Sequence, residues 1–139
     1  MALLSFALVG MALAGGSMAC SCAPQAPAES LREADAAIVG ELVEVAPQGR
    51  LRADYRYQVQ RVYRGGGIEP GEMLIVRSAR RASACALPRR LGRRYGLFLF
   101  RGDGQWRGGI CGVIGPRRLW RAAQGQAAAR ASGAGSRCL

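Results

Sequence analysis

Two cysteines one residue apart, Cys20 and Cys22, directly follow a segment that has the pattern of a signal peptide. Residues 1–19 carry no charged side chain and consist of an apolar run followed by small residues. The last three, Ser17-Met18-Ala19, fit the small-x-small rule for signal peptidase, so we expect cleavage at their end. Cys20 would then carry a free α-amino group beside its thiol. Such a terminus allows a chelating amine, a disulfide or a lipid anchor.

The chain has five cysteines, at positions 20, 22, 85, 111 and 138. In an exported chain they predict disulfides formed in an oxidising compartment, and an odd count leaves one thiol unpaired or paired between chains. We therefore expect a secreted protein, extracellular or periplasmic, with a lipid-anchored cell-envelope protein as the alternative. Ser17 stands where a lipobox prefers Leu, which disfavours the lipid anchor.

The chain contains no histidine, which excludes a Ser-His-Asp triad, a Cys-His dyad and a histidine-rich metal site. The acidic residues show no spacing typical of a catalytic carboxylate pair, so we predict a protein that is not an enzyme and has no cofactor of its own. The net charge is +11, and all 20 basic residues are arginine. Such a charge can serve an anionic partner such as nucleic acid or a membrane surface. We favour the other explanation, a genome rich in G and C whose codons replace Lys by Arg, so a nucleic-acid partner is not expected and a membrane contact is expected only if Cys20 carries a lipid.

Hydrophobic periodicity predicts a short helix, five strands and a second helix. The expected elements are a helix over 28–34, strands over 36–45, 54–63, 73–76, 93–101 and 105–110, and a helix over 117–131. A shift of the apolar face near Gln60 predicts a β-bulge, and Asp103-Gly104 predicts a hairpin turn. Pro47-Gln48-Gly49 predicts another turn. This order fits an all-β protein with flanking helices, a five-stranded closed barrel of the OB type.

In the second helix we expect Leu119, Trp120 and Ala123 to form the packing side. Asp35 lies between the first helix and the first strand, where we expect it to cap the helix or to turn the chain.

The chain resembles a netrin-type domain, and within that group the N-terminal domain of the tissue inhibitors of metalloproteinases. The resemblance lies in the Cys20-Ser21-Cys22 start, the Ala34-Asp35 step, the Tyr63-Arg64-Gly65 turn, Cys85 and Cys111. It implies a netrin-type barrel over 20–115, followed by a helix and tail over 116–139. It also implies bridges from Cys20 to Cys85 and from Cys22 to Cys111. The family's third bridge would need a cysteine at Arg32, so Cys138 is expected to be unpaired or to link two chains as a dimer.

In inhibitory members of this family, the amine and carbonyl of the first cysteine chelate the catalytic zinc of a protease. The resemblance implies that Cys20 contacts a zinc metalloproteinase in this way and that Ser21 enters its specificity pocket. The residues expected to line the cleft are Cys22, Ala23, Pro24, Ser83, Ala84, Cys85, Ala86 and Leu87. An amine and a carbonyl of one residue close a five-membered ring with zinc and displace the hydrolytic water.

Two other functions remain open. The first is an exported or lipid-anchored netrin-type domain that binds a protein without inhibiting it, because a fold does not fix function. The second is single-strand nucleic-acid binding by an OB barrel, which needs exposed aromatic side chains beside a basic groove. The candidates for stacking are Tyr55, Tyr57, Phe98, Phe100 and Trp106, although aromatic residues on alternating strands more often belong to the core.

Overall fold

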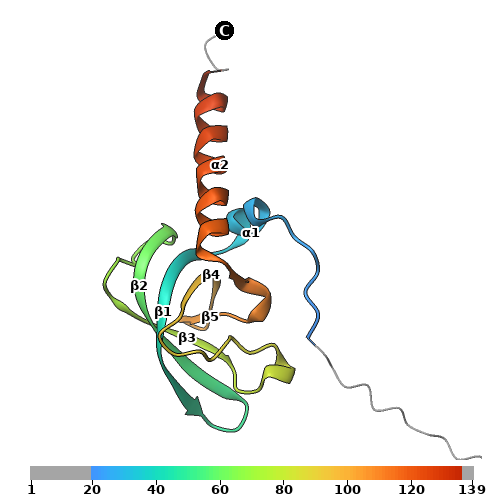
Figure 1. The fold of residues 1–139 in the computed structure, drawn as a ribbon, viewed down its shortest axis with the longest axis vertical. Helices are drawn as coiled ribbons and strands as arrows, with labels where there is room; N and C mark the ends of the chain where they lie inside the picture. Colours follow the sequence, from blue (N-terminus) through green and yellow to red (C-terminus); the bar gives the residue numbers. More distant parts are fainter. Residues whose placement is uncertain (1–19, 136–139) are drawn as a thin grey trace, which may run out of the picture.

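The computed structural model describes residues 20–135, which form a curved six-stranded sheet with a short helix before it and a long helix after it (Figure 1). The predicted signal peptide, residues 1–19, and Cys138 lie outside the described residues. The elements are α1 (Pro27–Glu33), β1 (Ala36–Gln48), β2 (Arg52–Arg64), β3 (Met73–Ala79), the 3-10 turn η1 (Ala82–Ala84), β4 (Arg94–Gly102), β5 (Gln105–Arg107), the 3-10 turn η2 (Ile110–Gly112), β6 (Val113–Ile114) and α2 (Pro116–Gly135).

The first strand organises the sheet, because it pairs on both of its edges. Along its length β1 is antiparallel to β2, and over Ala36–Glu41 it is also antiparallel to β4. Strand β3 pairs antiparallel with β2 and parallel with β5, and β4 pairs antiparallel with β5 and β6. Every strand therefore has at least one hydrogen-bonded neighbour, and β1 pairs in addition with β4, which stands fifth in the order β1-β2-β3-β5-β4-β6.

The predicted bulge and hairpin are both confirmed. Gln60 is the extra residue on β2, because Val39 pairs with Arg61 while Gly40 pairs with Val59. At the β4–β5 turn, Asp103 and Gly104 have φ angles of 53° and 72°, the left-handed geometry that tight hairpins prefer.

Several predicted boundaries were wrong. Pro47 and Gln48 belong to β1, and the turn that follows lies at residues 49–51. The strand predicted over 105–110 ends at Arg107, and the sheet has six strands because Val113–Ile114 forms β6. This short strand pairs with Gly96 and Leu97 of β4, a partner that the local sequence does not indicate.

Two layers of core lie on opposite faces of the strands. One face buries a cluster that includes Leu42, Tyr55, Tyr57, Leu97 and Leu99. Burial raises the pKa of the Tyr57 phenol, and its hydroxyl has no hydrogen-bond partner within residues 20–135.

The other face of β1 and β4 packs against the helices through Leu31, Phe98, Ile114 and Leu119. Gly96 permits this contact, since a Cβ there would lie 2.7 Å from the Ile114 carbonyl oxygen. Leu119 and Ala123 pack as predicted, but Trp120 was placed wrongly, because it is 45% exposed. Beyond these first turns, α2 projects away from the sheet (Figure 1).

Asp35 joins α1 to the sheet. Its main-chain N–H donates to the Leu99 carbonyl at 3.0 Å, and its carboxylate oxygen Oδ2 accepts from the Arg101 N–H at 2.8 Å. The residue therefore fixes where the chain leaves the helix and enters β1.

Candidate functional site

Two disulfides tie the start of the described chain to the sheet. Cys20 is bonded to Cys85 and Cys22 to Cys111, with a Cα–Cα distance of 5.3 Å in both pairs. This is the pairing that the resemblance implies. Disulfides of this kind belong to an oxidising environment. We call residues 20–24, with the two turns they are bonded to (82–85 and 109–111), the N-terminal edge.

The two turns of the N-terminal edge are themselves hydrogen-bonded to each other. Cys85 ends η1 in the left-handed conformation, with a φ of 64°, and its carbonyl accepts the Ile110 N–H at 3.0 Å. A Cβ on Gly109 would lie 2.9 Å from that carbonyl oxygen, so this close approach requires glycine. Both disulfides are consequently anchored on two turns that are hydrogen-bonded to each other.

Between its two bridges the N-terminal segment is open to solvent. Cys20 is half-buried, whereas Ser21, Cys22, Ala23 and Pro24 are exposed. Figure 1 shows this segment (blue) as an extended strand of chain outside the sheet, leading into α1.

The segment is held at its ends more than along its length. A cavity of about 400 Å³ separates residues 22–25 from the sheet, with Phe98 and Ile114 in its wall. Gln25 Nε2 donates to the Glu33 carboxylate at 2.7 Å, which fastens the segment to α1. The covalent bridges, and not close packing, therefore fix the position of Ser21.

The segment predicted to lie beside the N-terminus divides into an exposed and a buried part. Ser83 and Ala84 are exposed and Cys85 is half-buried. Ala86 and Leu87 are only 6% and 2% exposed, so they were wrongly expected to line a partner's cleft. Leu87 packs in the core, and its N–H donates to the buried Ser78 hydroxyl at 3.2 Å.

Sequence reasoning missed two residues of this edge. Gly109 provides the close approach described above, and Ile110, directly before Cys111, has an apolar side chain that is 37% exposed. The Gly108-Gly109 pair, which is separated from Cys111 by Ile110, was a usable signal, because glycine in such a place marks a close approach of main chains.

Arginine side chains flank the edge on the side of Ala84 and Cys85. Arg52, Arg77 and Arg107 line a hollow of about 480 Å³ there. Arg77 Nε donates to Asp54 at 2.9 Å, and this hydrogen bond raises the pKa of the guanidinium. Arg107 is paired with Asp103 at 2.8 Å, so two of the three cations are already neutralised.

The described residues hold no metal-binding cluster of their own. Within residues 20–135, no group of three or more His, Cys, Asp or Glu side chains could hold a metal ion, and all four cysteines there are in disulfides. No helix in that part of the chain is long and apolar enough to cross a membrane.

The aromatic residues considered for nucleic-acid stacking are mostly internal. Tyr55 and Tyr57 are fully buried and Phe98 is 6% exposed, so these three belong to the core, as is usual for aromatic residues on alternating strands, and offer no stacking surface. Phe100 is exposed, and Trp106 is half-buried with the Arg101 guanidinium 4.8 Å from its ring centroid. An extended row of exposed rings is therefore absent among these five candidates.

No protein-family model matches the chain, and no curated protein matches it.

Proposed function

We propose that the mature protein is a secreted netrin-type inhibitor that binds zinc metalloendopeptidases through the N-terminal edge. The observation that carries the proposal is the pair of disulfides, which hold Cys20 and Cys22 on neighbouring turns while Ser21 between them is exposed. A segment already fixed in an extended form loses little freedom on entering a protease cleft, which lowers the ordering cost of binding.

Cys20 is the chelating residue in this proposal. After cleavage behind Ala19, its α-amine and carbonyl would bind the zinc of the partner and displace the hydrolytic water. An α-amine has an ordinary pKa of about 8, so losing its proton on binding at neutral pH costs little. Because the thiol is bonded to Cys85, the backbone groups are the ligands that remain.

The surroundings of Cys20 would supply specificity. Ser21 would enter the protease pocket next to the zinc, and Ala23, Pro24, Ser83 and Ala84 would contact the rim of the cleft, since all are exposed. Ala86 and Leu87 are left out of this contact set because they are buried. The protein would act by binding alone, with no catalysis and no cofactor of its own.

We also infer that the sheet is a closed OB-type barrel of the netrin kind. The support is that β1 pairs with β2 on one edge and with β4 on the other, while β3 and β4 both pair with β5. Such a barrel gives the two turns of the N-terminal edge a stiff base.

The first test is the intact mass of the exported protein together with its N-terminal residue. The expected result is a chain that starts at unmodified Cys20 and contains two disulfides. An acylated Cys20, or any residue retained before it, would contradict chelation, because neither leaves a free α-amine on Cys20.

The second test is inhibition of a panel of zinc endopeptidases by this mature protein. One alanine added before Cys20 should abolish inhibition, because the amine becomes a peptide nitrogen, whereas one alanine added after the last residue should leave it unchanged. If protein with a free Cys20 amine inhibits none of the panel, the non-inhibitory netrin-type binding domain is the better description.

A further inference from the structure

A second candidate site lies away from the N-terminal edge, in a groove between α2 and the sheet. The groove has a volume of about 730 Å³. One wall is the start of α2 with Arg117, Arg118 and Trp120, and the other is Gln60, Arg61 and Tyr63 of β2, with Val39 and Arg94 between them. Its size is that of a small-molecule site.

The four arginines of this groove lack partners. Within the part of the chain that the structure describes, Arg61, Arg94, Arg117 and Arg118 make no ion pair, hydrogen bond through the guanidinium, or ring contact. Three arginines elsewhere on the sheet, Arg56, Arg77 and Arg107, are instead each paired with a carboxylate.

One carboxylate lies near the groove. Glu41 is opposite Arg94 in the β1–β4 register, and it accepts a hydrogen bond from Gln60 Nε2 at 3.2 Å. Four guanidinium charges less this one carboxylate leave a net charge of three positive units at the groove. The lining residues themselves include no Asp or Glu among those the structure describes.

The start of α2 also favours an anion in the groove. The N–H groups of Arg117 and Arg118 precede the first helical hydrogen bond, which runs from the Leu119 N–H to the Gly115 carbonyl at 3.0 Å. A helix start favours negative charge, yet the first turn carries two arginines and no acidic residue. An anion in the groove would offset both the repulsion among the guanidiniums and this unfavourable placement.

Two aromatic side chains give the groove an apolar component. Tyr63 comes from β2 and is half-buried, and Trp120 comes from α2 and is 45% exposed. Flat rings of this kind bind a planar or cyclic group, while the planar fork of arginine binds phosphate oxygens in pairs.

We propose that this groove binds a small organic anion of the nucleoside-diphosphate type, in which two linked phosphate groups are attached to a ring. Such a ligand carries about three negative charges at neutral pH, which matches the net charge of the groove. The phosphates would lie among Arg61, Arg94 and Arg117, and the ring would contact Tyr63 or Trp120. This proposal is independent of protease inhibition.

Binding is tested by titrating the mature protein with a nucleoside diphosphate, pyrophosphate and inorganic phosphate at low ionic strength. The chain has two tryptophans, so in a Trp106→Phe background the fluorescence of Trp120 reports on the groove directly. The expected order of affinity is nucleoside diphosphate, then pyrophosphate, then phosphate. Equal affinity for the first two would overturn the role of the ring, and no saturable binding of any probe would overturn the site.

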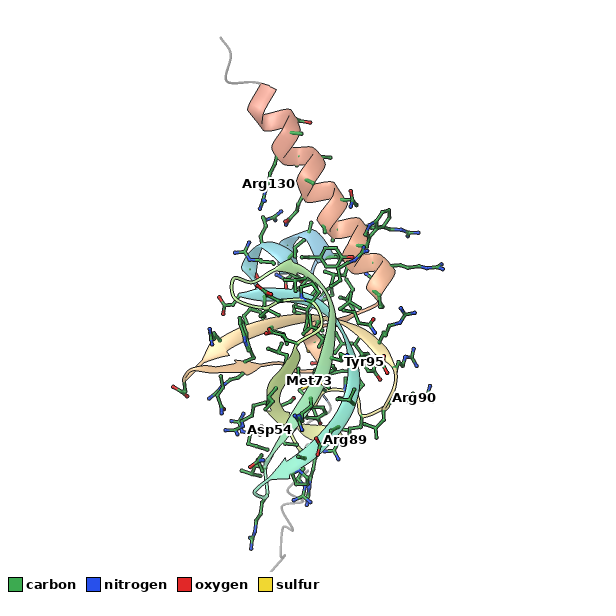
Figure 2. All side chains as sticks on the ribbon, turned by 90° about the vertical axis from the view of Figure 1, so that its left-hand side faces the viewer. Asp54, Met73, Arg89, Arg90, Tyr95 and Arg130 are labelled. Carbon is green, nitrogen blue, oxygen red and sulfur yellow. A yellow bond between two sulfur atoms is a disulfide. The ribbon has the colours of Figure 1, made fainter. Side chains whose placement is uncertain are left out.

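Matched pairs of substitutions separate this site from general charge attraction. In calorimetric titrations, Arg61→Gln with Arg117→Gln should weaken binding at least tenfold, because two phosphate contacts are lost. Arg89→Gln with Arg90→Gln removes the same charge from two side chains that lie below α2 in Figure 2 and do not line the groove, and it should leave the affinity unchanged. An equal loss in both pairs would overturn the proposal.

A third variant covers the ring. In calorimetric titrations, Trp120→Leu should lower the affinity for the nucleoside diphosphate several-fold. The affinity for pyrophosphate should stay the same, since only the ring contact is removed. An equal loss for both ligands would contradict the ring contact at Trp120. Thermal unfolding of each variant checks that the fold is intact.

Discussion

The N-terminal edge and helix α2 are the two ends of the described chain, and they are attached to the same sheet in different ways. Residues 20–24 are held by two covalent bridges and are separated from the sheet by a cavity. Helix α2 is held without a covalent bond in the described residues, by Leu119, Ala122, Ala123 and a hydrogen bond from Gln126 Nε2 to the Ala28 carbonyl. The N-terminal segment is thus held by covalent bonds while it stays exposed, whereas α2 is held by the burial of Leu119 in its first turn.

The largest expected effect comes from removing a bridge. Changing both Cys22 and Cys111 to Ser should lower the free energy of unfolding by about 4 kcal/mol, because the unfolded chain regains the freedom of a loop with a sequence separation of 89 residues. Chemical denaturation of the oxidised proteins measures this loss. A change below about 1 kcal/mol would mean that the N-terminal edge does not depend on its covalent attachment.

The corresponding test on α2 is Leu119→Ala. Leu119 is fully buried between the helix and the sheet, so its truncation should cost about 2–4 kcal/mol. Trp120→Leu, one position along on the exposed side, is the control and should cost less than about 1 kcal/mol. Comparable losses at the two positions would show that the helix does not pack through the Leu119 side.

A smaller effect is expected where α2 and β6 approach the sheet most closely. Gly96→Ala should cost about 1–3 kcal/mol, because the new methyl group would meet the Ile114 carbonyl. Gly66→Ala is a suitable control, since a Cβ there has open space around it. Thermal unfolding measures the stability of both variants. An unchanged stability of Gly96→Ala would mean that β6 can move away from β4 at little cost.

The smallest effect lies in the core beneath both ends. Tyr57→Phe should stabilise the protein by up to about 1 kcal/mol, since it removes a buried hydroxyl without a partner in the described residues. Burial raises the Tyr57 pKa in the folded state above about 10, its ordinary value in the unfolded chain. The unfolded state therefore loses its proton first, and stability falls as pH rises above about 10.

Urea unfolding of wild type and Tyr57→Phe at pH 7 and at higher pH measures this contribution. The wild type should lose more stability than the variant on going above pH of about 10, because the variant lacks the titrating group. Parallel losses would assign the alkaline instability to other groups.

The local sequence predicted most of the helices, strands and turns, but few of the contacts between them. The bulge at Gln60 and the Asp103-Gly104 hairpin were predictable, because each leaves its signal within a few residues. Strand β6 was not, since two residues show no periodicity and Gly96, its partner, lies far away in the sequence. The exposure of Trp120 depends on which side of α2 faces the sheet. Leu119 and Trp120 are adjacent in the sequence and point in different directions on a helix, and the sequence alone did not show which of the two faces the sheet.

The candidate sites divide in the same manner. The cysteine pairing came from the family resemblance, not from spacing, and the burial of Leu87 followed only from its contact with Ser78 and the core. The α2 groove could not be predicted from the sequence, because Arg61, Arg94 and Arg117 belong to three elements that come together only in the folded protein.

The bonding of Cys20 to Cys85 and of Cys22 to Cys111 also sets an order of events in biosynthesis. Cys20 must wait until residue 85 has been made, and Cys22 must wait until residue 111 has been made, before its bridge can form. A reducing compartment would leave both cysteines as thiols and the segment unattached. The N-terminal edge is therefore completed late, after residue 111 has been made and only where the chain lies in an oxidising space.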